Sequence, residues 1–128
     1  LSQKNPVGRI LIVIMEAQDL LQDTTNEVNF TELDKGQGTK GVVTIFDIGV
    51  FCEASVGMQK FTTHSIDSGN PKWNTSMQFQ FYDLNKDVLA VNMYDRKVYK
   101  PNTFLGKLEF KILHIYREQV KENQENNN

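Results

Sequence analysis

The chain of 128 residues has the length of one compact domain, so a second independent core is not expected. Its 14 lysines and arginines nearly balance 16 aspartates and glutamates, and this net charge of −2 argues against a general nucleic-acid binder. A hydrophobic fraction of 39%, with 8 Phe, 4 Tyr and 1 Trp, supplies a core that an intrinsically disordered chain lacks. The single cysteine, Cys52, excludes an internal disulfide and is expected to be a buried, reduced thiol.

Apolar runs of strand length recur along the chain, and none has the 3.6-residue repeat of a helix. The first run is apolar at every position, which predicts a strand buried on both faces. The clearest run alternates Met77, Phe79 and Phe81 with glutamines, which predicts a strand with one buried face. Such spacing predicts an antiparallel sandwich or barrel. The expected strands are residues 10–15, 50–56, 59–65, with a hairpin at Gly57, and then 77–81, 88–94 and 108–112.

Two polar segments lie outside this plan. Residues 22–47 hold three glycines and more acids than lysines, and a loop this long is either functional or mobile. Within it, Val42–Phe46 is β-prone and is expected to add a strand or extend the one after it. The tail, residues 117–128, is low in complexity and predicts a disordered tail or linker. The first residue is Leu1, so we expect a piece of a longer polypeptide.

Three motifs occur in order between residues 67 and 106. They are Asn70-Pro71-Lys72-Trp73-Asn74, then Tyr94-Asp95-Arg96, then Phe104-Leu105-Gly106. Together they resemble the C2 domain over residues 8–115, and the chain is most similar to the C2 domains of intersectin-type endocytic scaffold proteins. The resemblance implies an all-β, antiparallel Greek-key sandwich of eight strands, here residues 1–116, with residues 22–47 inserted in the first loop. A closing strand would come from residues 2–7 or from chain beyond residue 128.

Many C2 domains bind calcium through about five loop aspartates, because this cation takes 6 to 8 oxygen ligands. The resemblance puts the third-loop ligand positions on Asp95, Lys97 and Thr103, and the bridging aspartate of the first loop on Gly49. A lysine at a ligand position repels a metal ion, so neither calcium nor another cofactor is expected. Three carboxylates remain as remnant ligand candidates. These candidates are Asp95, Asp23 and Asp47. An alternative is calcium-dependent phospholipid binding through a loop site rebuilt from the acids of the insertion.

The expected function is calcium-independent docking to an anionic membrane surface. Arg96, Lys97 and Lys100 surround Val98 and Tyr99, which combines cations with a residue suited to the headgroup region. Lys60 is a further candidate, on the strand expected at 59–65. The alternative is a protein-binding module that captures a partner through residues 22–47 or through an exposed edge strand.

Enzyme function is not expected. His64 and His114 have no partner residues in a catalytic pattern, and Gly36-Gln37-Gly38 is too short to indicate a phosphate-binding loop. The longest apolar run is far shorter than a membrane span, and no signal-peptide pattern precedes it. We therefore expect a cytoplasmic module of a larger endocytic or exocytic trafficking protein, peripheral at a membrane or vesicle surface.

Overall fold

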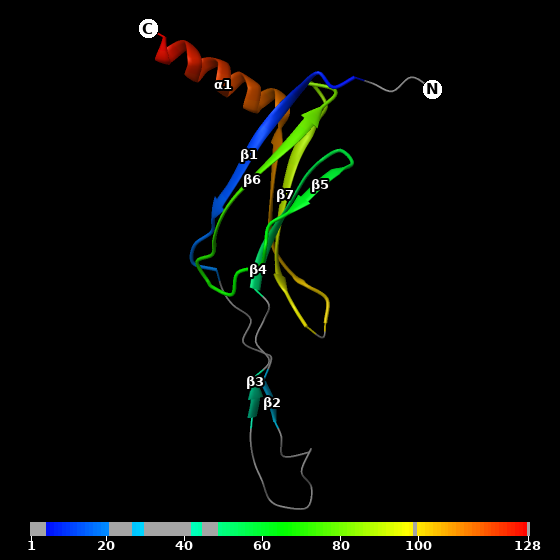
Figure 1. Cartoon of the computed structure of the whole chain (residues 1–128), viewed down its shortest axis with the longest axis vertical. Helices are drawn as coiled ribbons and strands as arrows, with labels where there is room; N and C mark the ends of the chain where they lie inside the picture. The colour runs from blue at the N-terminus through cyan, green and yellow to red at the C-terminus, as the bar shows by residue number, and fades with distance from the viewer. Residues whose placement is uncertain (1–4, 21–26, 30–41, 45–48, 99, 128) are drawn as a thin grey trace, which may run out of the picture.

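Two antiparallel sheets face each other in the computed structural model, which describes residues 5–20, 27–29, 42–44, 49–98 and 100–127 (Figure 1). The predicted antiparallel β-sandwich is confirmed. One sheet pairs β1 (Gly8–Glu16) with β6 (Lys72–Phe81). The other has the order β5 (Gln59–Thr62), β4 (Gly49–Val56), β7 (Val88–Arg96) and β8 (Thr103–Lys111), and α1 (Ile112–Asn126) follows it. The β-prone segment expected at 42–46 contributes β3 (Val42–Thr44), which pairs with β2 (Glu27–Asn29) as an added strand, and residues 45–48 lie outside the described residues.

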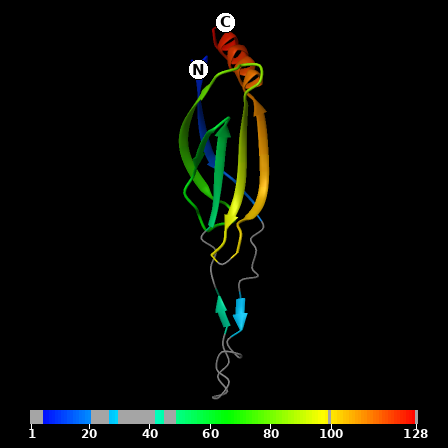
Figure 2. The ribbon, with the colours of Figure 1, turned by 90° about the vertical axis from the view of Figure 1, so that its right-hand side faces the viewer.

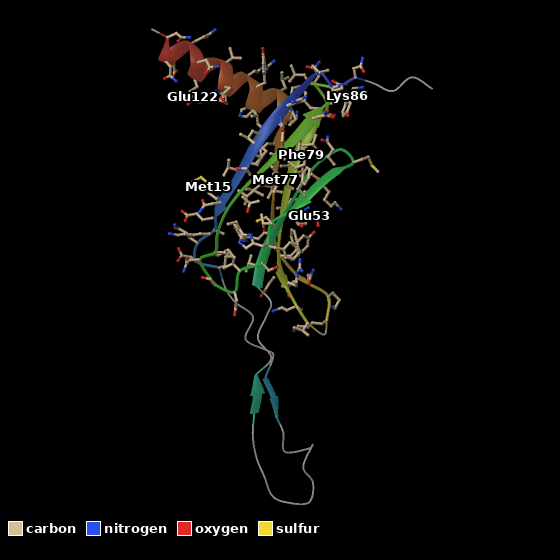
Figure 3. All side chains as sticks on the ribbon, viewed as in Figure 1. Met15, Glu53, Met77, Phe79, Lys86 and Glu122 are labelled. Atoms are coloured by element: carbon tan, nitrogen blue, oxygen red, sulfur yellow. The ribbon has the colours of Figure 1, made fainter. Side chains whose placement is uncertain are left out.

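The core lies between the sheets and follows the alternation seen in the sequence. Met77 and Phe79 point inward from β6 (Figure 3), and Phe79 packs in a cluster that includes Ala54 and Leu89. Nearer the other end of the sandwich, Trp73 is buried, and its indole N–H donates to the Val50 carbonyl oxygen at 3.1 Å. The Asn-Pro-x-Trp-Asn turn is thereby anchored across the two sheets.

Strand β1 exposes one of its two faces, so the prediction that both are buried was wrong. Ile10, Ile12 and Ile14 pack on the core, whereas a stripe of three apolar residues on the opposite face is exposed. Val7 donates its backbone N–H to Phe81 at 2.8 Å, so it extends the pairing with β6 and does not close the outer edge. Among the described strands, β6 alone pairs with β1. The exposed stripe consists of Leu11, Val13 and Met15.

The inner face of β8 is also uncovered. Leu108 and Phe110 lie opposite Val91 and Leu89 of β7, so they point to the core side of the sheet. They are nevertheless 61% and 40% exposed. The described part of the opposing sheet has two strands against four, and it does not reach across β8 (Figure 2). An apolar cavity of about 360 Å³ opens there, lined among others by Ile14, Trp73 and Leu108.

We expect the free edge of β1 to cause concentration-dependent self-association, because an apolar edge strand is a template for pairing with another chain. Val13→Lys places a charge on the edge and is expected to suppress association. The control is Ser76→Lys, which puts the same charge directly opposite Val13 but on β6 instead of β1. Sedimentation velocity over a concentration series measures the effect. Equal association of the two variants would contradict the role of the edge.

The C-terminal segment forms a helix, so the predicted disorder is wrong for residues 117–126. Helix α1 begins directly after β8, with Ile112 buried and Ile115 packed on the core. Its later residues are mostly Glu, Gln, Lys and Asn, of which the first three are good helix formers. Two apolar anchors at the start therefore suffice to begin a helix whose later residues are mostly exposed. The domain boundary at residue 116 stays a prediction.

Cys52 is buried between the sheets as a free thiol, as predicted, and burial raises its pKa to about 11. The thiolate is the reactive form, so the native thiol is expected to react slowly with a disulfide reagent at pH 8 and rapidly after denaturation. Because the folded state holds this proton more tightly, the contribution of the thiol to stability falls as pH rises toward 11. Equal rates in native and denatured protein would contradict this burial.

Candidate functional site

A buried ion pair lies where β7 enters the loop to β8, which we call the third loop. The Lys97 ammonium lies 3.1 Å from Asp95 Oδ2, and the two side chains are only 1% and 4% exposed. Residues two apart on an extended strand share a face, so Asp95 and Lys97 both point inward. The Lys97 backbone N–H donates to Asn102 Oδ1 at 3.1 Å, which fixes the turn. The expectation that Lys97 contacts headgroups was therefore wrong, because its ammonium is withdrawn from the surface.

Arg96 faces the opposite side of the sheet from Lys97. Its guanidinium carbon lies 4.6 Å from the centre of the Phe51 ring, a cation–π contact. Phe51 stacks on Tyr94 at 5.5 Å between ring centres, and Tyr94 meets Phe104 edge-on at 5.8 Å. We call Phe51, Tyr94 and Phe104 the aromatic row, since they cross three neighbouring strands beside the third loop.

A β-bulge places Phe104 in this row. Met93 pairs with Gly106, but the next residue, Tyr94, pairs with Phe104, so Leu105 is the extra residue. Leu105 packs on the core, and Phe104 turns to the outer face. A strict period of two, continued back from Leu108, would have put Phe104 inside. Sequence reasoning missed it for that reason, and the Phe-Leu-Gly motif was the available signal.

The other predicted site residues are dispersed. Val98 and Lys100 are exposed in the third loop. Lys60 lies on β5 and forms an ion pair with Glu53 at 3.2 Å. Tyr99, Asp23 and Asp47 lie outside the described residues. The third-loop end therefore brings together Arg96, Val98 and Lys100, whereas Lys60 belongs to a separate, charge-compensated surface.

Gly49, at the start of β4, occupies a position where no side chain fits. Its φ is +120°, and a Cβ atom there would lie 2.4 Å from the carbonyl carbon of Ile66. Gly49 also pairs with Arg96, directly beside the third loop. Glycine is thus required by the backbone at this position.

Comparison with known proteins identifies the family of this chain. The family model described as the C2 domain matches residues 8–127. The chain belongs to the C2 family. It is 44% identical to mouse intersectin-2 over 120 residues, which is 92% of this chain and 6% of that protein. It is 37% identical to human intersectin-1 over 70 residues, 54% of this chain and 4% of that protein. The predicted resemblance is confirmed.

Solved C2 domains have the same fold. A calcium-bound structure of two C2 domains of extended-synaptotagmin 2 superposes with a TM-score of 0.67 at 27% identity, covering 91% of this chain and 38% of that one. A C2 domain of RIM from Drosophila gives 0.60 at 14% identity, over 88% of this chain and 80% of that one. The second likeness concerns the fold alone.

The C2 domain described here gathers no metal-ligand cluster among its described residues, counting groups of three or more His, Cys, Asp or Glu side chains. Asp95 is the one predicted ligand candidate that the structure describes, and a lysine ammonium lies against it. In the described part of the chain, no helix has the length and hydropathy needed to cross a bilayer.

Proposed function

We propose that this C2 domain docks to anionic membrane surfaces without calcium, as a targeting module of a larger trafficking protein. The observation that carries the proposal is the ammonium of Lys97 buried against Asp95. A positive charge already lies where the third-loop carboxylate would meet a metal ion, so a divalent cation entering there is repelled at short range. The neighbouring ligand position is Gly49, which has no room for a carboxylate side chain.

Surface charge at the same end supports docking. Arg96 and Lys100 lie on either side of the exposed Val98, and each cation near an anionic surface contributes about 1 kcal/mol. Two such cations give weak binding by themselves, so the module would act together with other membrane contacts of a longer protein. Lys60 adds little to this attraction, because Glu53 compensates its charge.

The test is co-sedimentation with phosphatidylcholine vesicles that contain or lack phosphatidylserine. We expect Arg96→Glu/Lys100→Glu to lower binding to the anionic vesicles by at least about tenfold. The control is Lys86→Glu/Lys121→Glu, which makes the same change in charge at two exposed sites. Lys86 lies at the far end of the sandwich (Figure 3), and Lys121 lies on α1 at that end (Figure 1). Equal losses of vesicle binding in both variants would mean that binding depends only on the net charge of the domain. That result would contradict a specific docking surface at the third-loop end.

A second candidate is protein binding by strand addition at the free edge of β1. The observation that favours it is the exposed apolar edge of β1 together with the uncovered side chains of Leu108 and Phe110. Its occupant would be an extended segment with apolar residues at alternate positions. A chain that stays monomeric at every concentration in the sedimentation series would remove this support. Capture through residues 22–47 is tested separately, by deleting residues 22–44.

We further propose that the domain has no catalytic role. Its one cysteine is buried with a raised pKa, which keeps the thiol in its unreactive form. His64 and His114 belong to different parts of the described fold, after β5 and in α1.

A further inference from the structure

The apolar cavity at the open side of the sandwich is bounded by both sheets. It measures about 360 Å³, within the range of small-ligand pockets, roughly 300–1,000 Å³. One wall is a cross-strand row on the inner face of β4, β7 and β8, because Cys52 pairs with Met93 and Met93 pairs with Gly106. Ile14 and Trp73 line the cavity from the opposing sheet. We call this space the Trp73 cavity.

Gly106 is what leaves room in the Trp73 cavity. Gly106 lies two residues before Leu108 on β8, so a side chain at position 106 would point inward as that of Leu108 does. A Cβ atom at Gly106 meets no atom within 4 Å. Protein cores contain few voids larger than a water molecule, so a space of this size between two sheets is unusual. A glycine on the inner face of β8 therefore provides the volume for a ligand.

The walls of the Trp73 cavity favour a hydrocarbon. The indole N–H of Trp73 already donates to the Val50 carbonyl oxygen, so Trp73 offers only its ring. Cys52 and Met93 contribute sulfur atoms, which are weak hydrogen-bonding groups. Among the described residues, Ser65 Oγ is the one buried side-chain polar atom without a hydrogen-bond partner, and Ser65 does not line the cavity. A polar group inside the cavity would lose its hydration without gaining a partner.

The opening of the Trp73 cavity suits a ligand with one polar end. The sheet of β1 and β6 does not reach across β8, so the cavity meets solvent on that side (Figure 2). The two charged lining residues, Glu16 and Lys107, are exposed, and Lys107 forms an ion pair with Glu109 at 2.6 Å. Because the charges at the opening have opposite signs, it favours neither an anionic nor a cationic head group.

We propose that the Trp73 cavity binds the unbranched acyl chain of a monomeric fatty acid, with the chain between the sheets and the carboxylate in water. A peptide segment in the cavity would bring backbone N–H and C=O groups that need partners, whereas an acyl chain brings none. Each methylene that enters the cavity strengthens binding by about threefold to fourfold. This inference does not depend on membrane docking, because the ligand binds from solution.

Trp73 reports the occupancy of the cavity directly, since it is the single tryptophan of the chain. The probe is 10-bromodecanoic acid below its critical micelle concentration, because bromine quenches tryptophan only at close contact. We expect saturable quenching of Trp73 emission, which unlabelled decanoic acid reverses by competition. From hexanoic to decanoic acid, we expect competition to strengthen by about threefold to fourfold per methylene. Decanoic acid should also raise the thermal unfolding temperature of the domain.

Gly106→Leu tests the location, because its side chain would occupy the cavity. We expect it to weaken quenching by at least about tenfold, the loss of roughly two buried methylenes. Glu109→Leu is the matched control, since it adds the same side chain to the outer face of β8 and should bind as the wild type does. Thermal unfolding shows whether each variant is folded.

Two results would overturn the proposed site. The first is quenching that does not saturate, or that is equal in the wild type and in a folded Gly106→Leu variant. The second is an unfolding temperature raised by decanoic acid with no quenching of Trp73 by the brominated acid. That result would place the ligand elsewhere, for example in the wider groove of about 640 Å³ between β1 and α1.

Discussion

We expect Lys97→Ala to lower the free energy of unfolding by about 3–5 kcal/mol, because it removes the ammonium that lies 3.1 Å from the buried Asp95 carboxylate. Breaking one partner of a buried ion pair leaves a desolvated charge, which costs far more than the pair itself contributes. Urea denaturation followed by the emission of Trp73 measures the loss. A change below about 1 kcal/mol, the scale of a surface pair, would contradict the burial of this lysine.

The double variant Asp95→Asn/Lys97→Met separates charge from packing. Removing both charges leaves no buried ion without its partner, so we expect this variant to be more stable than Lys97→Ala. Lys100→Ala is the matched control, since this neighbouring lysine is exposed in the same loop. If the double variant is as unstable as Lys97→Ala, the uncompensated charge of Asp95 is not the cause of the loss.

We expect Gly49→Asp to unfold or strongly destabilise the domain, by several kcal/mol, rather than to create a calcium ligand. The new Cβ would lie 2.4 Å from the carbonyl carbon of Ile66, and a φ of +120° is a conformation that side-chain-bearing residues rarely adopt. The effect is measured by thermal unfolding with and without calcium.

Gly106→Ala is the control for this substitution. Gly106 lies on β8, where a Cβ meets no atom within 4 Å, so we expect little change in stability. A folded Gly49→Asp variant that calcium stabilises would contradict the account, because it would mean that the first-loop position can still carry a ligand.

The fold follows closely from the sequence, because alternation reports which side of a strand is buried. The period of Met77, Phe79 and Phe81 identified β6 and its inner face. The first strand was misjudged, since an all-apolar run does not reveal whether a neighbouring strand covers both faces. Helix α1 was missed because its apolar anchors come only at its start.

The candidate site was harder to predict. The alternation of apolar and polar residues along a strand does not reveal the β-bulge that turns Phe104 outward. One extra residue in the strand reverses the side of the sheet to which the residues before it point. A cluster of cationic residues in one loop does not reveal which of them forms a buried ion pair. Lys97 was grouped with Arg96 and Lys100, and the distinction depends on the carboxylate two residues earlier in the strand.

The most direct test of the central claim is co-sedimentation of the wild-type domain with vesicles of phosphatidylcholine and phosphatidylserine, in about 1 mM calcium and in EGTA. We expect the same bound fraction in both conditions, because the cation that meets Asp95 is Lys97. Binding that appears only with calcium would contradict it and would point to a metal site rebuilt from the acids of the insertion.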